Sequence, residues 1–266
     1  MGKDTHRDPR FTYNGRPVLI EGHRGYKGRF PENTLLSFDE AIKAGAGQLE
    51  FDIRAAGDGT VFVFHDANVD RTTNGSGPLS SLTYDEVKEL DAGSWFGPEF
   101  KGEKVPTLAE ALDFLKGKAR LNIEVKTSDT TEELWKTAVR GAVVEIDKRD
   151  MWEQVIFSSF SPEALWYVKE LKPEAALGLL DWDLTRENNN KQKLLDMGGK
   201  YWLLHGSLLS EEVISEAHRQ GLEVFSGVGD DPDGLEARLK AALDMGLDVI
   251  ATDHAGEVWE ALKRIL

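Results

Sequence analysis

The sequence predicts an α/β protein folded as a (β/α)8 TIM barrel with a small insertion after the second strand. Three observations support this fold class. The chain has 266 residues, and such a barrel typically needs about 250. Short apolar runs rich in β-formers alternate with helical patterns along most of the chain. Eight such strand–helix units follow one another, whereas a doubly wound sheet usually has about five or six strands.

The expected strands are short apolar runs, and the segments between them have apolar residues at three- and four-residue spacing. Helical patterns of this kind cover Thr34–Ala44, Thr107–Leu115 and Glu211–His218. Thr34, Thr107 and Ser210 precede or open these patterns and are suitable N-caps. The eight expected barrel strands are Val18–Glu21, Gln48–Ile53, Leu121–Val125, Val155–Phe157, Ala176–Leu180, Tyr201–Leu204, Glu223–Phe225 and Asp248–Ala251.

One further strand interrupts the alternation. Only residues 54–60 separate Ile53 from Val61, and they contain Asp58-Gly59, a hairpin signal. The run Val61–His65 is therefore expected to lie antiparallel beside the second barrel strand. The following stretch, 68–104, has one short helical pattern at Tyr84–Leu90 and is too long for a bare connector. We expect it to be a small insertion over the top of the barrel.

The whole chain is expected to contain one domain, residues 18–266, preceded by a polar N-terminal tail, residues 1–17. The tail lacks the apolar core of a secretory signal, and no apolar run approaches the roughly 20 residues that cross a bilayer. These features predict a cytoplasmic protein without stable membrane insertion. The sequence leaves the oligomeric state open.

Charge and cysteine content exclude several classes of function. Thirty-two basic and 47 acidic residues give a formal net charge of −15, which would repel a nucleic-acid backbone. Nucleic acid is therefore not an expected partner. An anionic substrate would need local positive charge from a cation or from a few placed Arg and Lys side chains. The chain has no cysteine, so disulfides, thiolate nucleophiles and Cys-ligated zinc are excluded.

Three acidic side chains on neighbouring strands suggest a metal site. Glu50 and Asp52 occupy alternate positions of one strand, so they point to the same face roughly 6.6 Å apart. Glu124 on the next barrel strand would supply a third oxygen ligand. Three carboxylates without His or Cys suit one hard divalent cation, Mg²⁺ or Ca²⁺, better than zinc. The motif Glu50-x-Asp52 alone would more often be an ordinary polar strand end. With Glu124 on the neighbouring strand, a metal site becomes the favoured interpretation.

Two histidines flank the carboxylate pair in sequence. His23 and His65 both follow expected strands, and in a βα barrel the chemistry belongs at the carboxyl ends of the strands. Two imidazoles near neutral pH can divide the roles of general acid and general base. The remaining histidines are expected to be structural residues: His6, His205, His218 and His254.

Arg24 and Lys126 are the basic side chains of this predicted cluster. Arginine presents a planar fork to phosphate oxygens, and lysine acts as a point charge. Together with a divalent metal they would bind a phosphodiester and stabilise its additional charge in the transition state. The simpler interpretation is that they balance the carboxylates, and for Lys126 the two interpretations weigh equally.

The ordered set of motifs resembles the glycerophosphodiester phosphodiesterase family over Leu19–Asp253, nearly the whole chain. Single motifs are weak, but the order of the set is specific. The matching segments are His23-Arg24-Gly25, Pro31-Glu32-Asn33-Thr34, Glu50-x-Asp52, His65-Asp66, Arg71-Thr72-Thr73, Pro106-Thr107-Leu108, Glu124-x-Lys126, Ser159-Phe160 and Thr252-Asp253.

The resemblance implies hydrolysis of a glycerophosphodiester to glycerol 3-phosphate and an alcohol such as choline or ethanolamine. It implies that His23 and His65 are catalytic and that Arg24 and Lys126 contact phosphate. The metal ligands would be those already named, and the insertion at 68–104 would cover part of the active site. One histidine would activate the nucleophile, either water or the neighbouring glycerol hydroxyl, and the other would protonate the leaving alkoxide.

The chain departs from the family pattern in two places. The seventh strand of the family usually ends in a Trp-Thr-Val-Asn type segment, whereas this chain has Glu223-Val224-Phe225-Ser226. The absent Trp removes an apolar wall near the organic part of the substrate, which puts the substrate identity in doubt. Glu21, two residues before His23, adds a carboxylate that either raises the pKa of His23 or pairs with a buried base.

Two other functions remain open at this stage. A phospholipase D-like relative would act on lysophospholipids or sphingophospholipids by intramolecular transfer and release a cyclic phosphate. Its apolar loops would correspond here to Trp95, Phe96 and Phe100, although packing onto the barrel is the favoured role of these side chains. A non-catalytic barrel that binds phosphate esters or a partner protein would not need the complete ionisable cluster.

Overall fold

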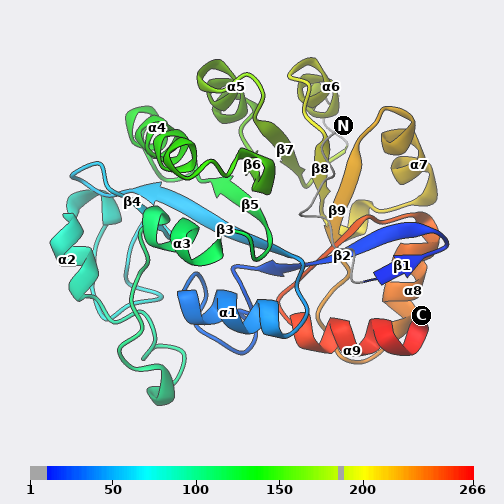
Figure 1. The fold of residues 1–266 in the computed structure, drawn as a ribbon, viewed down its shortest axis with the longest axis horizontal. Coiled ribbons are helices and arrows are strands. Elements are labelled where there is room, and N and C mark those ends of the chain that lie inside the picture. Colours follow the sequence, from blue (N-terminus) through cyan, green and yellow to red (C-terminus); the bar gives the residue numbers. More distant parts are fainter. Residues whose placement is uncertain (1–10, 185–188) are drawn as a thin grey trace.

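The computed structural model describes residues 11–184 and 189–266 and confirms the predicted barrel (Figure 1). Eight parallel strands pair in a closed ring, because β2 contacts both β10 and β3. The barrel strands are β2 (Arg16–His23), β3 (Gln48–Ala55), β5 (Arg120–Val125), β6 (Val155–Ser159), β7 (Ala176–Asp181), β8 (Tyr201–Leu204), β9 (Glu223–Gly227) and β10 (Val249–Thr252). Each contains or overlaps one of the runs predicted from the sequence.

Helices follow the strands and surround the ring (Figure 1). The predicted caps are present, since the hydroxyls of Thr34, Thr107 and Ser210 each accept a hydrogen bond from a backbone N–H in the first helical turn. The helices are α1 (Leu35–Lys43), α2 (Tyr84–Glu89), α3 (Leu108–Leu115), α4 (Glu132–Arg149), α5 (Pro162–Leu171), α6 (Asn189–Asp196), α7 (Glu211–Arg219), α8 (Leu235–Met245) and α9 (Ala255–Ile265). Each helix in the described part of the chain is too short or too polar to span a lipid bilayer.

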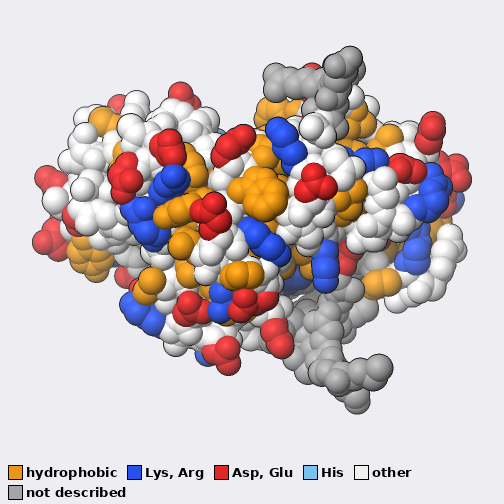
Figure 2. Space-filling model, turned by 90° about the horizontal axis from the view of Figure 1, so that it is seen from above, with side chains coloured by type: hydrophobic (Ala, Val, Ile, Leu, Met, Phe, Trp, Pro, Cys, Tyr) orange, Lys and Arg blue, Asp and Glu red, His pale blue; other side chains and the backbone are white. Residues whose placement is uncertain are grey.

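Apolar side chains form separate layers inside and outside the ring of strands. The larger cluster lies between the strands and the surrounding helices. A smaller cluster fills part of the barrel interior with side chains from β2, β6, β8, β9 and β10, namely Leu19, Ile156, Leu203, Phe225 and Val249. On the face shown in Figure 2, acidic and basic side chains are interspersed around hydrophobic ones. The net charge of −15 is therefore not gathered into an area of a single sign on that face.

The predicted hairpin is present, but the insertion lies elsewhere than expected. β4 (Val61–Val63) runs antiparallel to β3, and a third apolar cluster joins this hairpin to the segment 68–104. That segment includes α2 and two 3₁₀ turns at Leu79–Ser81 and Pro98–Phe100. β4 leads the chain away from the barrel, so α2 lies at the periphery (Figure 1). Phe96 packs against Phe100, and Phe100 packs against Phe30 of the segment between β2 and α1, whereas Trp95 is 38% exposed.

Part of the expected N-terminal tail is ordered. β1 (Phe11–Tyr13) pairs with the beginning of β2 in an antiparallel hairpin. Asn14 and Gly15 connect the two strands, both with positive φ (48° and 78°), as a two-residue hairpin turn requires. Phe11 is buried against Trp259, with ring centroids 4.4 Å apart. The tail prediction overlooked this Asn-Gly signal, and residues 1–10, including His6, lie outside the described residues.

Candidate active site at the carboxyl ends of the strands

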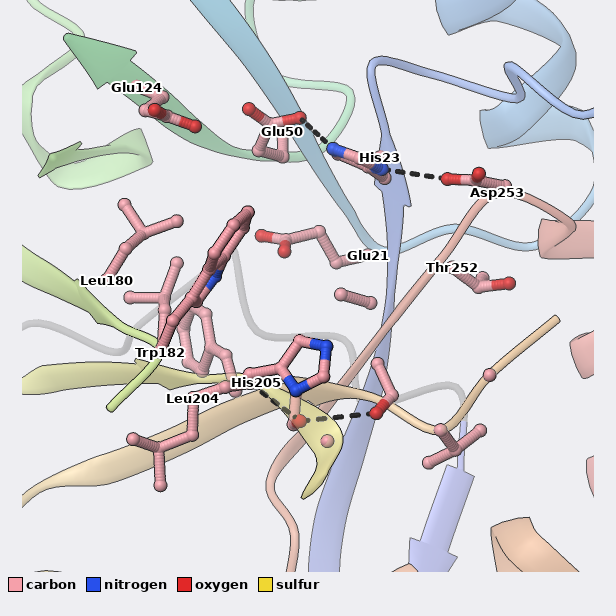
Figure 3. Close-up of a pocket in the computed structure, with 18 of the residues that line it drawn as sticks. Glu21, His23, Glu50, Glu124, Leu180, Trp182, Leu204, His205, Thr252 and Asp253 are labelled. Atoms are coloured by element: carbon pink, nitrogen blue, oxygen red, sulfur yellow. Dashed lines mark hydrogen bonds and ion pairs between the residues drawn. The ribbon is translucent and has the colours of Figure 1, made fainter. Parts of the chain in front are cut away.

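A cavity of about 1000 Å³ opens at the carboxyl ends of the barrel strands. One side carries the ionisable residues predicted from the sequence, on or directly after β2, β3, β4 and β5. The opposite side is formed by apolar and aromatic residues that end β6, β7 and β8 (Figure 3). Among the described residues, none from 68–104 lines this cavity. The insertion approaches the site beside His65, where Thr72 and Ala92 line a small second pocket with that histidine, so the expectation that it covers part of the active site stays a prediction.

The three predicted metal ligands converge. Glu50 and Asp52 lie on β3, and Glu124 lies on β5 directly beside Asp52 in the parallel register. All three are buried, and one carboxylate oxygen from each lies within 4.8 Å of the others. This spacing allows a single cation to contact all three residues.

The electrostatics of this triad indicate that positive charge is missing. Burial raises the pKa of Glu50 well above its usual value, and repulsion from Asp52 and Glu124 adds to the effect. Burial and Asp52 also raise the pKa of Glu124. Burial acts in the same direction on Asp52, but Lys126 and Arg24 outweigh it and lower its pKa. Glu50 Oε1 is buried without a hydrogen-bond partner among the described residues. A divalent cation with oxygen ligands fits this donor set.

The two predicted phosphate-binding side chains line the same cavity but contact the carboxylates. Lys126 Nζ lies 2.7 Å from Glu124 Oε1 and 2.9 Å from Asp52 Oδ1. Arg24 Nη1 donates to Glu32 Oε1 at 2.9 Å, and its Nε lies 3.5 Å from Asp52 Oδ2. Both cations therefore balance the acids in this structure while remaining on the wall of the cavity.

A tight turn after β2 positions His23 and Arg24. Arg24 and Gly25 both have positive φ, 53° and 85°. A Cβ at Gly25 would lie 2.4 Å from Ser37 Oγ, so only glycine fits there. The turn directs the backbone N–H of Arg24 to Glu50 Oε2, to which it donates at 2.9 Å.

His23 is held by a carboxylate from the far end of the chain. Its Nδ1 lies 2.7 Å from Asp253 Oδ1, and Lys27 Nζ lies 3.1 Å from Asp253 Oδ2. Its other ring nitrogen, Nε2, lies 3.9 Å from Glu50 Oε2 (Figure 3). A carboxylate on Nδ1 favours the tautomer with the proton on that nitrogen, which leaves Nε2 for proton transfer at the site.

His65 has an equivalent partner beside it in the sequence. Its Nδ1 lies 2.5 Å from Asp66 Oδ1. Arg71 Nε donates to Asp66 Oδ2 at 2.6 Å, and Arg71 Nη2 donates to Glu32 Oε1 at 2.7 Å. Arg71 and His65 lower the pKa of Asp66 to about 2 against the effect of its burial. Burial lowers the pKa of His65 itself.

The sequence motifs alone did not indicate several of these contacts. Asp66, Asp253 and Arg71 stood in matching motifs, but no role was assigned to them. Asn33 has a positive φ of 58°, and its Nδ2 donates to Asp52 Oδ2 at 2.8 Å. The adjacency of His65 and Asp66 was the one available signal. The other contacts join residues that are distant in the sequence and meet only in the folded barrel.

The other described histidines divide into two groups. His218 Nε2 lies 2.8 Å from Asp248 Oδ2, and His254 Nδ1 lies 3.8 Å from Glu257 Oε1, so both have structural partners. His205 was expected to be structural as well, but it lines the cavity. Its Nδ1 lies 2.8 Å from Ser207 Oγ.

The two departures from the family pattern both face the cavity. Phe225 of β9 lines it where the family has its Trp-containing segment, and Trp182 at the end of β7 adds an aromatic ring from another strand. Glu21 is 2% exposed, and its Oε2 accepts hydrogen bonds from Gln48 and Asn122. Burial raises the pKa of Glu21. Glu21 therefore pairs with amides of the barrel interior.

Comparison with known proteins identifies the family. A sequence model of the "Glycerophosphoryl diester phosphodiesterase family" matches residues 23–257. The chain belongs to this family. It is therefore an enzyme of the phosphoric diester hydrolase class.

Relatives within the family match over nearly their full length. A glycerophosphodiester phosphodiesterase of Caldanaerobacter subterraneus is 33% identical over 240 residues, which cover 89% of this chain and 94% of that protein. One from Bacillus altitudinis is 31% identical over 255 residues, or 92% of this chain and 99% of that protein. Among solved structures, an Oleispira antarctica phosphodiesterase in complex with its product sn-glycerol 3-phosphate is 30% identical. Its TM-score is 0.83, and the match covers 92% of this chain and 96% of that one.

Proposed function

We propose that this protein hydrolyses glycerophosphodiesters to glycerol 3-phosphate and an alcohol with one divalent cation, Mg²⁺ or Ca²⁺. The observation that carries the proposal is the convergence of Glu50, Asp52 and Glu124 within 4.8 Å, with Glu50 and Glu124 on the same cavity wall as His23 and His65. Membership of the family and the sn-glycerol 3-phosphate bound to the Oleispira relative support this substrate class.

Glu50, Asp52 and Glu124 would hold the cation, which when bound supplies positive charge to the phosphoryl oxygens and orients the ester. Arg24 and Lys126 line the cavity beside these acids. Lys126 and Arg24, which now compensate the charge of Asp52, would be partly released from that role when the three acids hold a cation. Both basic groups then become available to hydrogen-bond the phosphodiester and to stabilise the charge that develops on it.

The two His–Asp pairs provide the acid and the base. Asp253 and Asp66 each accept from Nδ1 of the neighbouring imidazole, so in each pair Nε2 is the atom that exchanges a proton with the substrate. One imidazole removes the proton from the nucleophile, which is water or the neighbouring glycerol hydroxyl; after attack by the hydroxyl, water opens the resulting cyclic phosphate to give glycerol 3-phosphate. The other donates a proton to the oxygen of the departing alcohol.

A second candidate substrate class is suggested by the size of the cavity. About 1000 Å³ is at the upper end of the volumes that small-molecule sites occupy. The wall opposite the acids is apolar, with Leu180, Leu204 and Leu209 among its residues. A lysophospholipid, whose acyl chain would occupy this wall, is therefore the alternative, with intramolecular transfer and a cyclic phosphate product.

A phosphodiester panel with product identification tests the proposal. Each substrate is incubated with Mg²⁺, with Ca²⁺ and with excess EDTA, and the products are identified by ³¹P NMR. Glycerol 3-phosphate as the end product, formed only with added metal, is the expected result. Turnover that survives saturating EDTA, or unaltered turnover in His23→Ala, would contradict the assigned site. A cyclic phosphate end product from lysophospholipids would favour the alternative.

A further inference from the structure

Two aromatic rings are exposed on the cavity wall that faces the acidic triad. Trp182, which follows β7, is 67% exposed, and Phe160, which follows β6, is 40% exposed. Their ring centroids lie 5.0 Å apart at an interplanar angle of 83°, and the ring centroid of His205 lies 6.0 Å from that of Trp182. Large exposed rings in a cavity that also contains ionisable groups indicate a ligand surface.

This wall carries no Lys or Arg side chain among the described residues that line the cavity. Arg24, Lys27 and Lys126 belong to the opposite side, where each contacts carboxylates. The remaining basic residue of the lining, Arg238, donates to backbone carbonyls such as that of Val228, at 2.9 Å. A positively charged ligand group would therefore meet no fixed cation at the aromatic wall.

A buried carboxyl group lies between this wall and the catalytic histidine. Figure 3 shows Glu21 projecting into the cavity between His23 and Trp182. Both of its side-chain hydrogen bonds end on Oε2, from Gln48 and Asn122. Glu21 Oε1 has no hydrogen-bond partner among the described residues. One oxygen of this carboxyl group is thus left for a ligand.

We propose that Trp182, Phe160 and Glu21 form the subsite for a quaternary ammonium group on the alcohol half of the substrate. The inference rests on the proposed function and narrows its substrate class to cationic head groups. Such a cation is attracted to the faces of aromatic rings and to the carboxylate of Glu21.

Other head groups would satisfy only part of this subsite. A hydrocarbon chain would cover the rings but would place apolar atoms against the carboxyl group of Glu21, whose free oxygen would lose its hydration. A polyol would hydrogen-bond to Glu21 but would bring no positive charge to the ring faces of Trp182 and Phe160. A trimethylammonium group has both the charge and the apolar methyl surface that the two features require.

A pair of isosteric substrates isolates the charge. The first is sn-glycero-3-phosphocholine, and the second is its 3,3-dimethylbutyl analogue, in which carbon replaces nitrogen. Both are present in one reaction, so the ratio of their kcat/KM values is measured directly. We expect the enzyme to prefer the choline ester by about two- to thirtyfold, the range that corresponds to cation–π contacts at exposed to desolvated sites.

Substitutions then assign the preference to the subsite. Trp182→Leu and Glu21→Gln should each move the ratio toward about one, and Trp182→Phe should retain part of it. Trp166→Leu is the matched control, because Trp166 is a comparably exposed aromatic, 42%, on α5 outside the cavity. Trp166→Leu should leave the ratio unchanged. Thermal unfolding of each variant verifies that it is folded. Because Trp182 is exposed, Trp182→Leu still tests the subsite if substitution of the buried Glu21 prevents folding.

The outcomes distinguish the inference from the proposed function. If both esters are hydrolysed equally by the wild-type protein, or if Trp182→Leu keeps the full preference, the subsite is refuted and the phosphodiesterase function stands. If a glycerol ester is preferred and Glu21→Gln alone removes that preference, Glu21 recognises hydroxyl groups instead. If no glycerophosphodiester is hydrolysed with either metal, the proposed function fails and the inference fails with it.

Discussion

Replacing Asp253 with Asn should disable His23 while leaving the rest of the site intact. Asp253 Oδ1 lies 2.7 Å from His23 Nδ1, and an asparagine amide at this position can donate to Nδ1. The imidazole would then carry its proton on Nε2 and could no longer accept one at the site. General acid–base catalysis contributes roughly 10²–10⁴-fold. Because the Asp253 side chain is 26% exposed and its effect is partly screened, we expect kcat to fall by about 10²-fold, or ~2.7 kcal/mol.

The assay is steady-state kinetics at saturating metal, combined with calorimetric titration of Mg²⁺ or Ca²⁺ into the variant. KM and metal affinity should remain near the wild-type values, since the Asp253 side chain interacts with His23 and Lys27 and not with the three acids. Asp248→Asn is the matched control, because Asp248 makes the same type of contact with His218, at 2.8 Å, outside the cavity. A kcat for Asp253→Asn within about threefold of the wild type would refute the assigned role.

Three further predictions concern the metal, the second histidine and the pH dependence of stability. Glu50→Gln should weaken metal binding in a calorimetric titration, with activity partly restored by excess Mg²⁺ or Ca²⁺; unchanged affinity would exclude Glu50 as a ligand. His65→Ala should lose turnover of choline esters while retaining metal affinity. Rescue by a highly activated leaving group such as p-nitrophenol would identify His65 as the acid, and no dependence on the leaving group would contradict that role. Burial and the hydrogen bond to Glu257 raise the pKa of Tyr26 to about 12. Its unfolded pKa is about 10, so the unfolded state binds fewer protons between these values and the free energy of unfolding should fall as pH rises from about 10 to 12. Urea denaturation of Tyr26→Phe across this range should show a smaller fall, and an equal fall would contradict the prediction.

The barrel and its polar cluster could be predicted because both depend on local patterns. Alternating apolar runs and helical periodicities define βα units, and parallel strands place residues such as His23, Glu50 and Glu124 at one end of the ring. The order of residues along β3 also brings Glu50 and Asp52 to one face. The β1–β2 turn at Asn14-Gly15 is equally local, because an Asn-Gly pair after Phe11-Thr12-Tyr13 is a hairpin signal.

The partners of the two histidines predicted to be catalytic are of two kinds. Asp66 follows His65 directly, so chain connectivity alone places it nearby. Asp253 lies 230 positions after His23 and reaches it because β10 pairs with β2 to close the barrel. The hydrophobic periodicity of the sequence does not indicate which side chains come into contact when the barrel closes. The same reasoning applies to Arg71, which reaches Glu32 from the insertion.

The sequence by itself determined the fold class, the cluster of acids and histidines, and the class of reaction, because these depend on residue type and on spacing within single strands. The tertiary structure decided which carboxylate orients His23, where the insertion lies, and how Trp182, Phe160 and Glu21 face one cavity. Those features depend on closure of the ring and on the direction in which the β4 hairpin leaves it. Both are set by packing among segments that are distant along the chain.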